Sequence, residues 1–216
     1  MFNAEQKRNG SHQGFWDLGI TEYESCLKWQ QQQVLLRQKN VITDRLNFTE
    51  HWPVYTIGSR KGACKHILPK HPPIPVVYTS RGGDVTYHGL GQIVGYPVIG
   101  LEQNKDLHQY LRNLEEVLIR VIQCLGLAAH RRKGKTGIWI EDRKLAAIGV
   151  GVKSWIAYHG FALNVNLDLN PFGAIIPCGI SPKEGSVSSL KKELQLSLDI
   201  DEVKELIAVE FWKIFD

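Results

Sequence analysis

The stretch that decides the fold is KLAAIGVGVK at residues 144–153, followed by HGFALNVN at residues 159–166. Both segments are short and rich in apolar residues, which predicts two buried β-strands. The next distinctive stretch, PCG at residues 177–179, is predicted to be a turn, because proline fixes φ and glycine permits unusual backbone conformations. A thiol in such a turn is presented by the backbone rather than packed into a core. We therefore select Cys178 as a candidate reactive group, with Lys144 as its candidate partner.

Length and composition fit a globular protein that can bury a substantial core. The chain has 216 residues, of which 43% are hydrophobic and 22% charged. A net charge of +4 favours an acidic protein partner but is too small to predict nucleic-acid binding. No apolar run is long enough to cross a membrane, and the polar first residues do not resemble a signal peptide. We expect a cytoplasmic protein with a disordered tail at 1–14 and a single domain at 15–216.

The pattern of apolar residues predicts an α+β fold rather than regularly alternating strands and helices. A capping box at Thr21 and Glu24 predicts a helix to about Arg37, and Asp106 and Gly126 bound a second helix. A third helix is predicted to begin at Asp199 or Asp201 and to run to the end of the chain. The predicted strands are at 41–48, 54–57, 76–79, 93–98, 137–141, 144–152 and 159–166. Strands dominate the middle, which is typical of a mixed sheet flanked by helices.

The four cysteines show no spacing that predicts disulfides or a zinc site. Cys26 and Cys124 fall within predicted helices and are interpreted as structural. Cys64 is flanked by basic residues that would lower its pKa, but its loop offers little preorganisation, so we interpret it as a surface thiol. No metal is predicted, and a serine hydrolase is disfavoured because the chain has no G-x-S-x-G motif.

The pairing of Cys178 with Lys144 has a chemical rationale. An unperturbed thiol with a pKa near 8.5 is only about 3% ionised at pH 7, and the thiolate is the nucleophile. A nearby ammonium group favours the thiolate, whereas burial alone would disfavour it. The spacing alone leaves a second interpretation open, in which Cys178 is a buried turn residue and Lys144 lies far from it on the surface.

The glycine-rich segment RGGDVTYHGLGQ at residues 81–92 matches neither the P-loop nor the dinucleotide-binding pattern. Phosphate binding is therefore unsupported. The glycines allow close approach of a backbone, so the segment is either a substrate-lining loop or a tight β-turn.

Five motifs occur in one order that resembles the octanoyltransferases of lipoate biosynthesis: RGGDVTYHGLGQ (81–92), GIW (137–139), KLAAIG (144–149), HGFALNV (159–165) and PCG (177–179). The resemblance runs from about Leu18 to Ser189. It implies the fold of biotin and lipoate protein ligases, a mixed β-sheet flanked by helices, at 15–216. It also implies an acyltransferase that moves an octanoyl group from acyl carrier protein to a lysine ε-amine, with no cofactor.

The resemblance assigns roles to residues of this chain. Cys178 matches the acyl-thioester nucleophile, and Lys144 matches the lysine that lowers its pKa and assists proton transfer. The residues that match the substrate-lining segments are Arg81, Gly82, Gly83, Asp84, Val85, Thr86, Tyr87, His88, Ala147, Ile148, Gly149, Gly160, Phe161 and Ala162.

The implied partners are octanoyl-acyl carrier protein as donor and lipoyl domains as acceptors, on 2-oxoacid dehydrogenase E2 subunits and glycine cleavage H protein. The sequence does not determine the oligomeric state, and nothing in it demands more than a monomer. Leu90 departs from a proline usual in the family, and Gly151 and Lys153 stand where arginines are common. Two alternatives are an ATP-dependent lipoate or biotin ligase and a non-catalytic carrier-binding protein. The sequence leaves open the acyl-chain length and the main acceptor.

Overall fold

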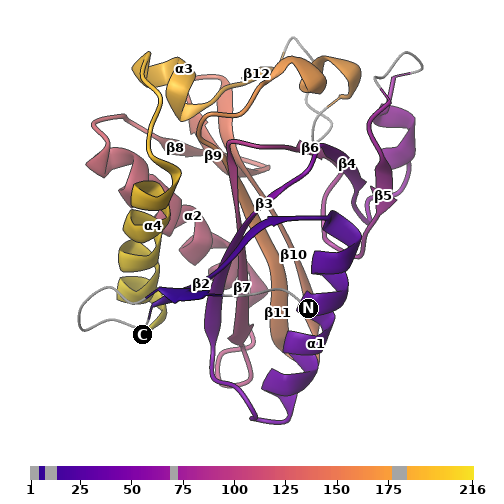
Figure 1. Cartoon of the computed structure of the whole chain (residues 1–216), viewed down its shortest axis with the longest axis vertical. Helices are drawn as coiled ribbons and strands as arrows, with labels where there is room; N and C mark the ends of the chain where they lie inside the picture. The colour runs from indigo at the N-terminus through magenta and orange to yellow at the C-terminus, as the bar shows by residue number, and fades with distance from the viewer. Residues whose placement is uncertain (1–4, 8–13, 69–72, 177–183) are drawn as a thin grey trace.

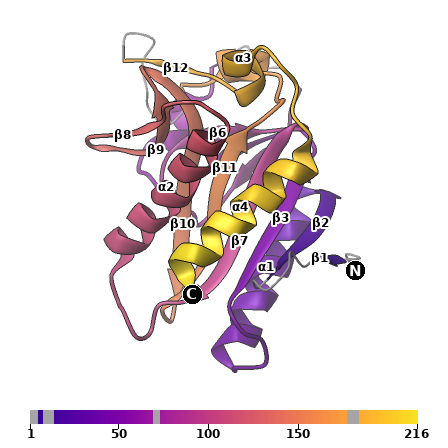
Figure 2. The same cartoon turned by 90° about the vertical axis from the view of Figure 1, so that its left-hand side faces the viewer.

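A nine-stranded mixed sheet forms the middle layer of the computed structural model, with helices on both faces (Figures 1 and 2). The structure describes residues 5–7, 14–68, 73–176 and 184–216. The sheet has the order β1-β2-β3-β7-β11-β10-β9-β8, and β12 also pairs with β10. A separate three-stranded sheet, β5-β4-β6, lies toward one end of the large sheet (Figure 1).

The large sheet contains β1 (Glu5–Lys7), β2 (Phe15–Thr21), β3 (Arg45–His51), β7 (Gln92–Gly100), β8 (His130–Arg132), β9 (Lys135–Ile140), β10 (Arg143–Lys153), β11 (Ile156–Asn164) and β12 (Ser186–Val187). The small sheet contains β4 (Val54–Ile57), β5 (Val76–Tyr78) and β6 (Val85–His88). The helices are α1 (Tyr23–Gln38), α2 (Leu107–Cys124), α3 (Leu190–Leu194) and α4 (Ile200–Phe215), with 3₁₀ turns η1 (Ala63–His66) and η2 (Asn170–Ala174). No helix in these described parts is long and apolar enough to cross a membrane.

The main core lies between the large sheet and the pair α2 and α4 (Figure 2). Helix α2 begins as predicted, because the Asp106 side chain accepts a hydrogen bond from the Gln109 backbone N–H. It ends before Gly126, whose φ of +81° suits a glycine. The prediction that Cys124 is structural was wrong, since this last residue of the helix is exposed.

Helix α1 covers the opposite face of the sheet, where Cys26 is fully buried against Leu18, Val94 and Tyr96. Burial raises the pKa of the Cys26 thiol to about 12, which confirms its structural role. The predicted capping box was wrong: Glu22 occupies the N-cap without a side-chain hydrogen bond. The Thr21 hydroxyl instead lies 2.9 Å from the Thr49 hydroxyl, because Thr21 is the last residue of β2.

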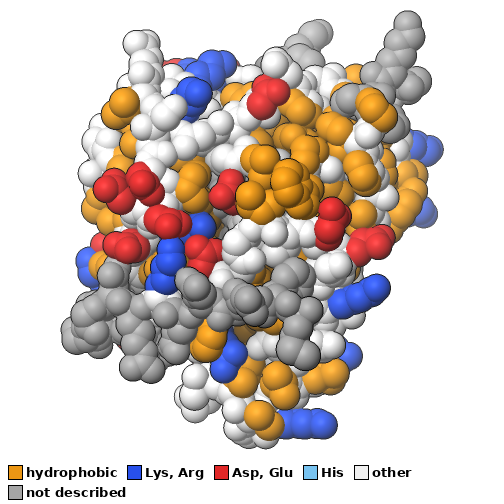
Figure 3. Space-filling model, viewed as in Figure 1, with side chains coloured by type: hydrophobic (Ala, Val, Ile, Leu, Met, Phe, Trp, Pro, Cys, Tyr) orange, Lys and Arg blue, Asp and Glu red, His pale blue; other side chains and the backbone are white. Residues whose placement is uncertain are grey.

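Three other sequence predictions differ from the structure. The strand predicted from residue 41 begins at Arg45, and the segment between the strands predicted at 54–57 and 76–79 contains the η1 turn. The tail predicted to be disordered contains β1, which pairs antiparallel with β2. On the face shown in Figure 3, basic side chains are scattered among acidic and apolar ones.

Gly95 of β7 provides a test of the core, because the Phe161 ring packs where a Cβ atom would project. We expect Gly95→Ala to lower the free energy of unfolding by about 1–3 kcal/mol through overpacking. Gly173→Ala is the matched control, since a Cβ atom there meets nothing within 4 Å. Urea unfolding of both variants measures the difference. Equal midpoints would show that Phe161 can move away without cost.

Candidate functional site

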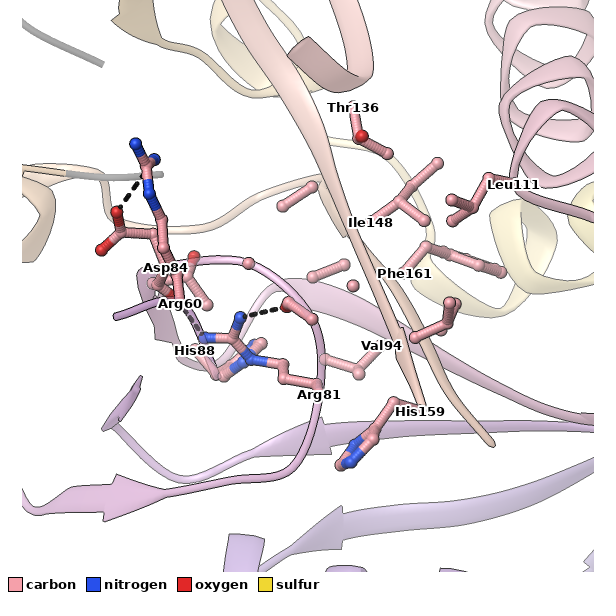
Figure 4. A pocket seen from close by; sticks show the side chains of 18 of the residues that line it. Arg60, Arg81, Asp84, His88, Val94, Leu111, Thr136, Ile148, His159 and Phe161 are labelled. Atoms are coloured by element: carbon pink, nitrogen blue, oxygen red, sulfur yellow. Dashed lines mark hydrogen bonds and ion pairs between the residues drawn. The ribbon is translucent and has the colours of Figure 1, made fainter. Parts of the chain in front are cut away.

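A cavity of about 460 Å³ opens between the strands β10 and β11, the loop before β6 and the first turns of α2 (Figure 4). Leu111, Ile148 and Phe161 form an apolar group, while Arg81 and His88 lie at another part of the cavity (Figure 4). Strands β10 and β11 pair antiparallel, with Gly149 opposite Gly160. This pairing brings two of the sequence motifs together in one wall.

The structure brings most of the predicted site residues to this cavity. Those that line it are Arg81, Gly82, Gly83, Asp84, Thr86, His88, Lys144, Ala147, Ile148, Gly149, Gly160, Phe161 and Ala162. Val85 and Tyr87 do not line it; they are buried in the second core with Tyr55 and Phe172. Alternate residues of a strand face opposite sides, so Thr86 and His88 reach the cavity while Val85 and Tyr87 face away. Cys178 lies outside the described residues.

Several lining residues were missed by the sequence analysis: Tyr23, Arg60, Val94, Tyr96, Leu107, Leu111, Gly134, Lys135, Thr136, Val150 and His159. Leu107 and Leu111 belong to the apolar stripe of α2, and periodicity alone assigns such residues to a core. His159 had a usable signal, because it precedes Gly160 within a recognised motif.

Arg81 is a buried cation that binds backbone oxygens. Its Nη2 donates to the carbonyls of Thr56, at 2.8 Å, and Asp84, at 2.7 Å. No carboxylate in the described parts of the chain forms an ion pair with it. The Gly82 backbone N–H donates to the Val150 carbonyl at 2.8 Å, and Gly58 leaves room for the Gly83 carbonyl. The loop is thereby fixed to both sheets and lines the cavity, whereas the β-turn of this segment lies beyond β6, where the Gln92 backbone N–H donates to the Gly89 carbonyl.

Asp84 is a buried carboxylate that lines the cavity and anchors neighbouring side chains. Its Oδ1 lies 2.7 Å from His66 Nδ1, and its Oδ2 lies 3.3 Å from Arg60 Nη1. Only 2% of the Asp84 side chain is exposed, so both contacts are shielded from water on one side. They hold the η1 segment, with the exposed Cys64, beside the cavity.

Lys144 lies in the cavity wall and is only 6% exposed. Its Nζ lies 5.5 Å from the centre of the Trp139 ring, a favourable cation–π geometry. A Cβ atom on Gly137 would lie 2.8 Å from Lys144 Cε, so glycine leaves the space that the lysine fills. Within the described residues, Lys144 has no carboxylate partner. A buried ammonium group of this kind can stabilise an anion at the cavity wall.

Tyr23, Tyr96 and His88 line the cavity, and the ring of His51 packs against all three. His51 Nε2 lies 2.7 Å from the Tyr96 hydroxyl, and the His88 ring stacks on Tyr23 with centroids 5.6 Å apart. Burial lowers the pKa of His51 to about 4 and raises that of Tyr23 to about 12. Burial is the largest cause that holds the pKa of His88 well below its usual value, and repulsion from Arg81, and from His51 when that ring is protonated, adds to it. All four groups are therefore neutral at pH 7.

His159 has a strained backbone, with φ at +57°, and lines the cavity with almost no exposure. Its ring stacks on Tyr158 at 4.6 Å, and its Nε2 lies 3.3 Å from the Ser80 hydroxyl. Its Nδ1 is buried and has no hydrogen-bond partner in the described structure. Burial, with the Arg81 charge, lowers the pKa of His159 to about 3, so this ring is also neutral.

The buried histidines make stability depend on pH. An unfolded histidine titrates near 6.5, so the unfolded state binds more protons as pH falls from 6.5 toward 4. The contribution of neutral His51 to the free energy of unfolding is fully present above pH 6.5 and decreases as the pH falls from 6.5 toward 4. At pH 5 we expect this contribution to the free energy of unfolding to be lower by about 2 kcal/mol. Urea unfolding of wild type and His51→Gln at pH 7 and 5 measures this. A wild-type pH dependence that persists fully in the variant would assign the titration elsewhere.

A scan of protein families matches residues 23–212 to the lipoyl protein ligase A/B catalytic domain. The octanoyltransferase of Geobacter metallireducens is 47% identical over 196 residues, covering 90% of each chain. That of Pelobacter propionicus is 44% identical over 201 residues, covering 93% of this chain and 94% of its own.

Solved structures share the fold at low sequence identity. The lipoate protein ligase of Thermoplasma acidophilum, studied with its E2 lipoyl domain, has a TM-score of 0.72 at 17% identity, covering 90% of this chain and 80% of that one. Biotin protein ligase from Aquifex aeolicus has a TM-score of 0.60 at 11% identity, covering 91% and 67%. The expected α+β fold of lipoate and biotin ligases is confirmed. With its relatives aligned over nine-tenths of its length, the chain belongs to the octanoyltransferase family.

Proposed function

We propose that this enzyme transfers an octanoyl group from acyl carrier protein to the lysine ε-amine of lipoyl domains. We further propose that residues 15–216 act as one catalytic domain, with E2 subunits and glycine cleavage H protein as acceptors. The observation that carries the proposal is Lys144: a buried ammonium group, without a carboxylate partner in the described residues, in the wall of a partly apolar cavity.

The apolar group of the cavity suits an acyl chain. Val94, Leu107, Leu111, Ile148 and Phe161 come from four different elements and surround one space. Burying a chain here would contribute roughly 0.8 kcal/mol per methylene. The neutral histidines and tyrosines add no charge beside the chain at pH 7.

The proposed reaction has two half-reactions with Cys178 as the nucleophile. In the first, the Cys178 thiolate attacks the donor thioester carbonyl, a new C–S bond forms, and the carrier thiolate leaves and takes up a proton. In the second, the acceptor amine loses a proton and attacks the acyl-enzyme, forming the amide and restoring the thiolate. The Lys144 ammonium would stabilise the thiolate by its charge and exchange protons with the reacting groups. The thioester donor is already activated, so no nucleotide is required.

The thioester intermediate is testable by intact-protein mass spectrometry after incubation with octanoyl-acyl carrier protein, without ATP. We expect one octanoyl group on wild type, released by hydroxylamine or by apo lipoyl domain. Cys178→Ser should gain no hydroxylamine-sensitive adduct. Lys144→Ala should be acylated about 10²–10⁴ times more slowly, because it loses the charge that favours the thiolate and the proton carrier.

Cys64→Ser is the matched control, since it removes the exposed cysteine of the η1 turn and should be acylated at the wild-type rate. No adduct on the wild type, with transfer that requires ATP and free octanoate, would instead support a ligase. No transfer under either condition, despite carrier binding, would support a non-catalytic protein.

A further inference from the structure

The hairpin of β8 and β9 carries a run of basic residues, HRRKGK at 130–135, next to the mouth of the cavity. Two of its residues, Gly134 and Lys135, line the cavity, and Arg112 of α2 lies nearby. We name Arg112, Arg131, Arg132, Lys133 and Lys135 the basic rim. All five are exposed or half-buried. None of them was assigned a role by the motifs.

The basic rim keeps an excess of positive charge after its ion pairs are counted. With Arg120, which shares Glu116, it contains six cations, and their ion pairs use three carboxylates: Glu115, Glu116 and Glu184. Three positive charges therefore remain uncompensated within this group. Lys133 is exposed and forms no ion pair with any described residue. Such an excess attracts an anionic partner.

A hollow of about 190 Å³ connects this rim to the acyl cavity. It shares four lining residues with the cavity: Leu111, Gly134, Lys135 and Thr136. Its other lining residues include Arg112 and Arg132. An elongated ligand can therefore place its acyl end beside Ile148 and an anionic group among basic side chains.

A buried carboxylate fixes the orientation of this rim. Glu115 is 1% exposed, and its Oε2 accepts from Arg112 at 2.6 Å and Arg131 at 3.2 Å. Arg132 is held over the Trp139 ring, 5.0 Å from its centre. The guanidinium groups are thus held in place before a ligand arrives, which reduces the entropy lost on binding.

The geometry points to the basic rim as the docking surface of the acyl donor, with the adjoining hollow receiving the phosphate of the donor's prosthetic arm. This inference rests on the proposed function. An acyl carrier protein is acidic, and it presents its thioester on a phosphopantetheine arm. Both its protein surface and the phosphate of its arm are therefore anionic. The reacting side chain of the acceptor is a lysine, which carries no anionic group for the hollow. The phosphate therefore distinguishes the donor arm from the acceptor arm.

The test compares the acylation rates of Cys178 by three donors: octanoyl-acyl carrier protein, octanoyl-phosphopantetheine and octanoyl-pantetheine. For Lys133→Glu, we expect the ratio of kcat/KM for the carrier to that for octanoyl-pantetheine to fall about tenfold, with a weaker salt dependence. Lys28→Glu makes the same charge change on an exposed position of α1 and should keep the wild-type ratio. Lys135→Ala should reduce the preference for octanoyl-phosphopantetheine over octanoyl-pantetheine.

Wild-type ratios in both Lys133→Glu and Lys135→Ala would overturn the inference. It would also be overturned if Lys133→Glu raised the KM for apo lipoyl domain and left the donor ratio unchanged, because the rim would then bind the acceptor. Failure of the proposed function is distinct: wild type would then be acylated by none of the three donors.

Discussion

The structure of the site depends on the buried guanidinium of Arg81. A cation with 8% exposure is stable only if its donors are satisfied, and here oxygens of Thr56, Gly82 and Asp84 accept them. These acceptors belong to the small sheet and to the loop that Arg81 itself begins. The same loop is bound to β10 of the large sheet through Gly82. The Arg81 side chain, which binds the small sheet at Thr56, and the Gly82 backbone, which binds β10 at Val150, therefore link the two sheets through one loop.

The Arg81 charge also shapes the electrostatics of the cavity. Its field adds to burial in lowering the pKa values of His88 and His159, so both rings remain neutral. Within the described residues, the charged side chains that line the cavity are Arg60, Arg81, Asp84, Lys135 and Lys144, and Asp84 pairs with Arg60. A positive, partly dry site of this kind favours a thiolate and a developing oxyanion, which is what acyl transfer requires.

Local patterns in the sequence predicted local structure and failed where distant contacts decide the outcome. The periodicity of α2 and the cap at Asp106 were sufficient to place that helix, since both act within a few residues. Thr21 was assigned to a cap, but its hydroxyl bonds across to β3, a partner that no short pattern reveals. The motifs identified both walls of the cavity. The motifs could not show that His88 faces the cavity while Tyr87 faces the second core, because this depends on the register of β6. They also could not identify Tyr96, which strand pairing brings to the site.

Lys144 and the basic rim share one support, Glu115. While its Oε2 binds Arg112 and Arg131, its Oε1 accepts a hydrogen bond from the Gly137 backbone N–H at 3.1 Å. Gly137 in turn lies against the end of the Lys144 side chain. A donor that binds the rim arginines would therefore contact residues that Glu115 holds in place. The same carboxylate fixes the backbone of Gly137, which lies beside Lys144. One buried carboxylate of α2 therefore contacts both the rim arginines and the backbone beside Lys144.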